Sequence, residues 1–187
     1  MPNVLPAAIV QALRHPAPEA ADFTAMQFTP ADSKAWFVAH FLRFASSDFP
    51  KHHFTDRFYR QVMNTFGFIA HYDKFGFWTE YFTNTAGKTE FLEQVIAWPC
   101  HGAATHTFCD AEREIARRIR QVDLLGLYRS KDRTEREAVN RLTFERLKSR
   151  FEPKGVAVQA AIEVPTPARV APRHAQPLAT QLAFAIG

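Results

Sequence analysis

The densest group of chemically versatile side chains lies in the stretch WPCHGAATHTFCD. Zinc takes four nitrogen or sulfur ligands in a tetrahedron, and Cys100, His106 and Cys109 would supply three of them. His71 or His101 would complete the shell. Only His106 and Cys109 have the two-to-four-residue separation that is typical of structural zinc sites. A zinc centre is therefore the weaker alternative, and the first interpretation is a loop with a buried thiol and no cofactor.

Covalent chemistry is a second weak alternative at the same place. Cys109 falls in the first turn of a predicted helix, where free amides favour a thiolate, and His106 lies one turn away as a base. Asp110 adds a negative charge that opposes the thiolate. A bridge between Cys100 and Cys109 is a further alternative, which a reducing compartment disfavours.

The first interpretation of the sequence includes no catalytic residue. The sequence contains no phosphate-cradling glycine loop, no G-x-S-x-G elbow and no H-E-x-x-H helix, and its seven glycines are scattered singly. These absences favour a binding protein, although a site assembled from distant residues would leave no such motif.

Basic residues form a candidate recognition surface. Arg113, Arg117 and Arg120 repeat at helical spacing, so they share one face of a helix and could follow a phosphate backbone or an acidic protein surface. The alternative nucleic-acid-binding set contains these three and four further residues, Arg118, Arg129, Lys131 and Arg133. The segment 110–154 holds thirteen Lys or Arg but also nine Asp or Glu, and intrahelical ion pairs would weaken its field.

An aromatic segment, FGFIAHYDKFGFWTEYF, is the second candidate surface. Eight of its seventeen residues are Phe, Tyr or Trp. Its second half alternates imperfectly between apolar and polar residues, and the run from Asp73 to Gly76 has turn composition, which predicts a short β-hairpin or extended segment. The aromatic residues that we predict to bind a partner are Tyr72, Phe75, Trp78 and Tyr81.

The elements that position these residues are about five helices, which predict a mainly α fold. Apolar residues recur at spacings of three and four, and capping residues or prolines mark the ends. The predicted helices span residues 30–46, 50 or 55 to 70, 86–98, 107–126 and 130–150. The last two would form an antiparallel hairpin. We expect four apolar residues of the fifth helix to face inward, namely Val139, Leu142, Leu147 and Phe151.

Proline-containing ends flank this helical region. We predict a docking extension over 1–29, one helical domain over 30–152 and a flexible Pro/Ala-rich tail over 153–187, whose apolar residues 182–186 could dock. With two cysteines, no signal-like N-terminus and no apolar run long enough for a membrane span, the chain is expected to be cytoplasmic, with no membrane partner.

These features favour a small binding protein over an enzyme. Abundant aromatics and clustered arginines predict an adaptor or inhibitor that contacts another protein, as is typical of accessory proteins of bacterial mobile elements. The alternatives are a protein that binds DNA or RNA through its basic helical face, and an enzyme that depends on zinc or cysteine.

Overall fold

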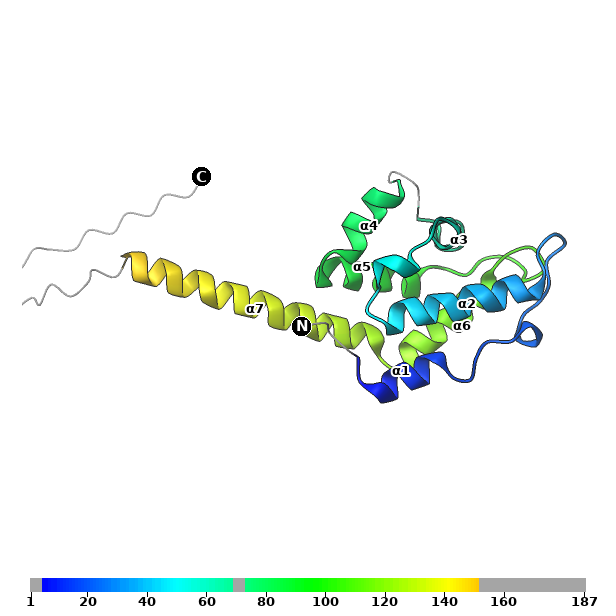
Figure 1. The fold of residues 1–187 in the computed structure, drawn as a ribbon, viewed down its shortest axis with the longest axis horizontal. Coiled ribbons are helices and arrows are strands. Elements are labelled where there is room, and N and C mark those ends of the chain that lie inside the picture. Colours follow the sequence, from blue (N-terminus) through cyan, green and yellow to red (C-terminus); the bar gives the residue numbers. More distant parts are fainter. Residues whose placement is uncertain (1–4, 69–72, 152–187) are drawn as a thin grey trace, which may run out of the picture.

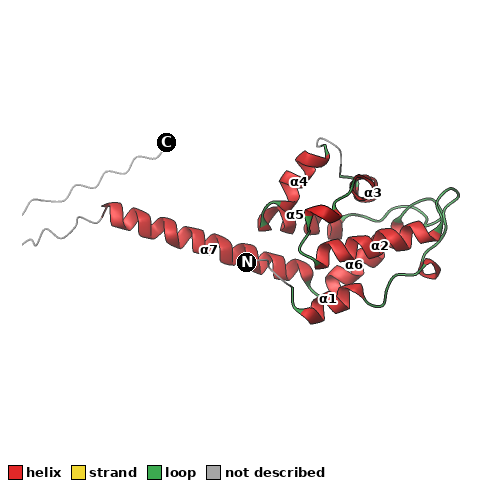
Figure 2. Ribbon diagram, in the orientation of Figure 1, coloured by secondary structure: helices red, strands yellow, loops and turns green. Residues whose placement is uncertain are grey.

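Seven α-helices make up most of residues 5–68 and 73–151, the part of the chain that the computed structural model describes (Figures 1 and 2). They are α1 (Ala7–Arg14), α2 (Ala31–Ser46), α3 (Asp56–Phe66), α4 (Lys74–Phe82), α5 (Thr85–Ala97), α6 (Cys109–Gln121) and α7 (Leu124–Phe151). Two 3-10 turns, η1 (Ala20–Asp22) and η2 (Lys51–His53), connect them. Within these residues the only β pairing is an isolated bridge between Met26 and Thr29. The mainly α fold class is confirmed.

The predicted hairpin in the aromatic segment is wrong, because this segment is helix α4. Asp73 caps the helix, since its Oδ1 accepts a hydrogen bond of 2.6 Å from the Gly76 amide. The run that resembled a turn is therefore a helix start. Phe77 and Tyr81, four residues apart, are buried together, whereas Phe75 is 70% exposed. Packing has overridden the strand preference of the aromatic residues.

Three other helices lie close to their predicted bounds, and their caps explain why. The hydroxyl of Thr55 accepts from the amide of Phe58 at the start of α3, and the side chain of Asn84 accepts from the amide of Gly87 at the start of α5. Helix α3 ends four residues before its predicted limit because Gly67 adopts a left-handed conformation, with φ of 58°. This conformation suits a glycine that terminates a helix.

The Gly67 turn supplies a stability prediction. A Cβ atom on Gly67 would overlap the indole ring of Trp98, and the positive φ is itself unfavourable for alanine. Gly67→Ala should lower the free energy of unfolding by about 1–3 kcal/mol, measured by urea denaturation. In a Trp98→Ala background the same change should cost less, because only the backbone strain remains; equal costs in both backgrounds would show that the ring contact is irrelevant.

The core is built around the aromatic side of α2. Phe37, Phe41 and Phe44 are buried at helical spacing and meet rings from α3 and α5. Phe44 lies 5.2 Å from Phe58 of α3, measured between ring centroids, and Phe41 lies 5.9 Å from Phe91 of α5. This cluster removes a large apolar area from water and holds the helices together without a sheet.

The N-terminal segment contributes to this core. Helix α1 packs against α2 and α6, and Leu13 is fully buried. The guanidinium of Arg14 donates from Nε to Ser46 Oγ over 2.7 Å, which ties α1 to the end of α2. The proposed division at residue 29 stays a prediction, and the predicted tail lies outside the described residues.

The predicted hairpin of the last two helices is wrong. Gly126 does not end a helix; it lies in the first turn of α7, where its amide donates to Asp123 Oδ1 over 3.1 Å. The first part of α7, residues 124–132, is its root and packs on the body, and most of the rest projects away from the body (Figure 1). The four apolar residues expected to face inward are therefore exposed by 44–72%, and these are Val139, Leu142, Leu147 and Phe151.

Candidate macromolecule-binding surface

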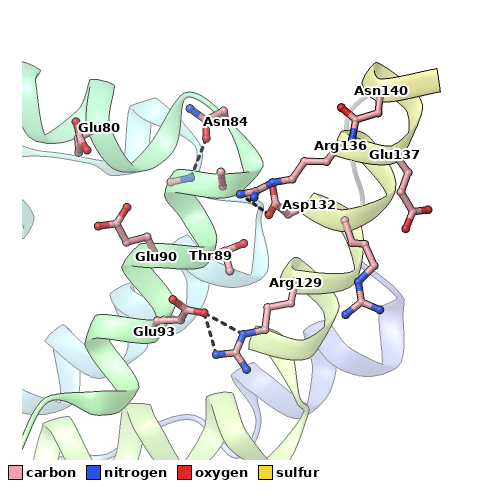
Figure 3. Close-up of a pocket in the computed structure, with 13 residues that line it drawn as sticks. Glu80, Asn84, Thr89, Glu90, Glu93, Arg129, Asp132, Arg136, Glu137 and Asn140 are labelled. Carbon is pink, nitrogen blue, oxygen red and sulfur yellow. Dashed lines mark hydrogen bonds and ion pairs between the residues drawn. The ribbon is translucent and has the colours of Figure 1, made fainter. Parts of the chain in front are cut away.

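A polar groove of about 790 Å³ lies between α5 and the root of α7 (Figure 3). One wall is acidic, and the other carries both signs. The wall made by α4 and α5 presents Glu80, Glu90 and Glu93, whereas the α7 wall presents the acids Asp132 and Glu137 beside three guanidinium groups, those of Arg129, Arg133 and Arg136. One ion pair spans the groove, with Arg129 Nη2 2.8 Å from Glu93 Oε1. The groove is therefore a charged cleft with both signs available.

The sequence of α5 explains its acidic wall. Phe91, Leu92 and Val95 are buried against the core, so the opposite face of the same helix is left for Glu90 and Glu93. This is the ordinary arrangement of an amphipathic surface helix. The acidic groups of the groove are thus positioned by a rigid, well-packed element.

A buried hydrogen-bond network fixes the root of α7. Tyr128 donates from its hydroxyl to Asp48 Oδ1 over 2.7 Å, and the Nζ of Lys88 donates to the same oxygen over 2.8 Å. Burial, reinforced by Asp48, raises the pKa of Tyr128 well above its ordinary value, so the phenol stays a hydrogen-bond donor. Leu124 is buried beside it. The direction in which α7 leaves the body is therefore set by specific contacts.

The charged groups of the groove are open to solvent. The side chains of Arg129 and Glu93 are 58% and 43% exposed, and exposed pairs of this kind contribute little to stability. Arg136 pairs with Asp132 one turn earlier on the same helix. Such weak pairs can be exchanged for the charged side chains of a partner at low energetic cost. The exposed charged groups of the groove are therefore accessible to a charged ligand.

The remainder of the helix is called the distal α7 here, residues 133–151, and every residue in it is exposed. It carries six Lys or Arg and three Asp or Glu, which leaves an excess of positive charge. At about 100° per residue, Val139 and Leu142 share one side, whereas Phe144, Leu147 and Phe151 gather on another. The helix therefore presents apolar residues in two directions, separated by basic side chains.

The aromatic residues predicted to bind a partner are only partly available. Tyr72 lies outside the described residues. Phe75 is exposed and Trp78 is half-buried, and both line a shallow cavity of about 410 Å³. Tyr81 is buried, and its hydroxyl accepts from Gln94 Nε2 over 3.3 Å. The exposed part of this predicted surface is reduced to Phe75 and the edge of Trp78.

The arginine row of α6 is engaged by neighbouring groups at two of its three positions. Arg117 makes two hydrogen bonds of 2.7 Å to Glu114, which lower the pKa of that carboxyl and raise the pKa of Arg117. Arg120 donates to the carbonyl of Ile96 over 2.8 Å. Arg113 is exposed. All three arginines of the row are exposed, and the role of the row in binding stays a prediction.

The remaining residues of the nucleic-acid set differ widely in their surroundings. Arg118 is buried, pairs with Glu114 and donates to the carbonyl of Leu13, so it serves the packing of α1 on α6. Lys131 lies 3.8 Å from Glu135. Arg133 is exposed and, in the part of the chain described, forms no ion pair.

Sequence reasoning missed Arg141, Arg146 and Phe144 of the distal α7. The first two form no ion pair within the described ranges 5–68 and 73–151, and all three are exposed. The excess positive charge of this segment is visible in the sequence and is typical of an exposed helix, but its apolar residues were expected to lie in the core. The acidic wall of the groove was missed because it depends on the packing of α5.

Within the described residues, the cysteines and histidines of the WPCHGAATHTFCD stretch do not form a metal site. Cys100 and Cys109 are disulfide-bonded, with their Cα atoms 5.2 Å apart, and His71 lies outside the described residues. Over residues 5–68 and 73–151, no group of three or more His, Cys, Asp or Glu is placed to hold a metal ion. The nucleophile alternative at Cys109 with His106 would need the disulfide to be reduced.

The disulfide also bears on the predicted compartment, since such bonds persist mainly in oxidising environments. The cytoplasmic location therefore stays a prediction. None of the helices in the described residues has both the length and the apolar composition needed to cross a membrane. No protein-family model, curated protein or solved structure matches the chain, so its function is inferred from its own residues.

Proposed function

We propose that this chain is a macromolecule-binding protein, an adaptor or inhibitor, that contacts another protein through the distal α7 and the adjoining charged groove. The observation that carries the proposal is a helical segment of nineteen residues, 133–151, in which every residue is exposed, including five large apolar side chains. They are Val139, Leu142, Phe144, Leu147 and Phe151.

Physical chemistry argues that such a helix has a partner. Most helical stability in proteins comes from packing an apolar face, and the apolar residues of the distal α7 are exposed. Phe144, Leu147 and Phe151 form one exposed apolar side of the distal α7, and exposed apolar patches commonly mark interaction sites. The distal α7 has excess positive charge as well, so a complementary partner would offer an apolar cleft bordered by acidic residues. Helix-in-groove recognition is the mode that fits.

Nucleic acid is the second candidate partner, favoured by one specific observation. Arg133, Arg141 and Arg146 project from α7 and form no ion pair within the described residues. They could follow a phosphate backbone. Binding of that kind would weaken steeply as salt is raised, whereas the burial of apolar side chains would be much less sensitive.

The variant Leu142→Ser with Phe144→Ser tests the proposal. Tagged full-length chain is purified from its native cell after nuclease treatment, and co-eluting proteins are quantified by mass spectrometry. We expect one protein to be recovered with the wild type and reduced at least about tenfold with the double variant, because two apolar anchors are lost. The helix should remain, since both side chains are exposed; far-UV circular dichroism checks this.

A matched control keeps the apolar residues and changes the charges beside them. Arg141→Ser with Glu145→Ser alters the same turns of α7 and leaves the net charge of the chain unchanged. This control should retain the partner. Equal recovery with both variants would contradict the apolar docking mode. In a parallel purification without nuclease, recovery of nucleic acid alone, lost as salt is raised, would favour the second candidate.

A further inference from the structure

A second cavity, of about 400 Å³, lies on the body away from α7. Gln61 and Asn64 of α3 form one wall, and the loop between α5 and α6 supplies Trp98, His101 and His106. Glu112, in the first turns of α6, completes the lining. The bond between Cys100 and Cys109 closes this loop at both ends, which fixes the loop beside α6. The cavity is therefore built from two helices and a covalently closed loop.

Glu112 is the unusual group in this lining. It is only 9% exposed, and its Oε2 is buried with no hydrogen-bond partner among the residues that the structure describes. A buried oxygen without a partner is costly, because it has lost its water. Burial raises the pKa of Glu112 to about 7; Asp110 adds to the rise and Arg113 opposes it. The group thus changes charge near neutral pH.

The surroundings of Glu112 indicate what would compensate its charge. None of the residues known to line this cavity is Lys or Arg. The two amide side chains and two imidazoles of the lining offer hydrogen bonds, and the indole of Trp98, which is 40% exposed, offers an aromatic face. A planar cation with two parallel N–H donors matches a carboxylate in geometry, and it can also lie against an aromatic ring.

We propose that this cavity binds a small organic cation bearing an amidinium or guanidinium group, held by the carboxylate of Glu112 and by the ring of Trp98. The loop histidines and the α3 amides then contact the rest of the molecule. No residue known to line this cavity belongs to α7, so the cation site and the proposed partner surface can be tested separately.

Benzamidinium is the probe, and benzamide is its neutral control of the same shape. Isothermal titration calorimetry on the full chain at pH 8 should show a Kd of about 1 mM for benzamidinium, in keeping with so small a molecule. Benzamide should bind at least about tenfold more weakly, because it cannot pair with the ionised carboxylate. Equal binding of the two, or no benzamidinium binding up to about 10 mM, would overturn the proposal.

Glu112→Gln removes the charge and keeps the shape. We expect at least about tenfold weaker benzamidinium binding, whereas Glu90→Gln, which changes an acid of the distant groove, should bind as the wild type does. Unchanged affinity in Glu112→Gln would overturn the proposal. Trp98→Phe should retain part of the affinity, because a smaller aromatic face remains.

The pH dependence follows from the sign of the shift. The cation needs Glu112 ionised, so binding by the wild type should be about tenfold weaker at pH 6 than at pH 8. Protonation of His101 and His106 would act in the same direction, and the profile of Glu112→Gln isolates their share; the wild-type profile must be steeper. Identical profiles for the two chains would contradict the role of Glu112.

The link between the pKa of Glu112 and the stability of the fold also predicts how stable Glu112→Gln should be. Folding raises the pKa of Glu112 above its ordinary value of 4.5, so its favourable contribution is present below pH 4.5 and is lost as the pH rises through about 7. Glu112→Gln should therefore be at least as stable as the wild type at pH 8 in urea denaturation. Lost binding in a stable variant then reports on the site alone.

Discussion

Replacing Lys34 with methionine is expected to lower the free energy of unfolding by about 3–5 kcal/mol. The side chain of Lys34 is fully buried, with its Nζ 2.8 Å from Asp110 Oδ1 and 2.7 Å from the carbonyl oxygen of Ala104. Removing the cation leaves a largely buried carboxylate and a carbonyl without their donor. Asp110 also accepts from the Thr24 amide, so the loss would loosen the junction of α2, α6 and the N-terminal segment.

A double-mutant cycle separates the ion pair from the packing around it. Lys34→Met and Asp110→Asn should each be strongly destabilising in urea, and the double variant should cost clearly less than the sum of the two, because no charge is then left alone. Full additivity would show that the two groups do not interact. A loss below about 1 kcal/mol for Lys34→Met would show that water compensates the carboxylate.

Phe58→Ala is the second substitution with a large expected effect, again about 3–5 kcal/mol of unfolding free energy. Phe58 is fully buried at the centre of the aromatic core, and its ring lies 5.2 Å from that of Phe44 and 4.5 Å from that of His40. Alanine would leave a cavity that the surrounding rings of α2 and of Phe54 cannot fill without losing their own contacts.

Phe75→Ala is the matched control, because it makes the same chemical change on the exposed side of α4. It should change the unfolding free energy by no more than about 0.5 kcal/mol. Both variants are compared by thermal and urea denaturation. Similar losses in the two would contradict the assignment of Phe58 to the core and Phe75 to the surface.

The helices whose ends carry local signals could be predicted from the sequence. Pro30 precedes α2, Thr55 caps α3, and Pro99 follows the end of α5, and each helix lies within a few residues of its expected position. These signals depend on backbone groups within a few residues, so they need no knowledge of the fold.

Features that depend on distant residues could not be predicted. The partner of Asp110 lies 76 residues away, on α2, and nothing local to either residue reveals the pair. The aromatic segment was ambiguous because its spacing fits a strand and a helix almost equally, and only packing on the core decides. The prediction that the apolar residues of α7 face the core was wrong for a related reason. A periodic apolar pattern shows that residues share one face of a helix, but it does not show what covers that face.

The length of α7 has a geometric consequence. Its twenty-eight residues span about 42 Å at 1.5 Å per residue, and the last nineteen account for about 28 Å of that length. A molecule held at the tip would thus be kept away from the body of the protein. The helix acts as a spacer whose angle is set by Tyr128 and Asp48, so a change at that joint would redirect whatever the far end carries.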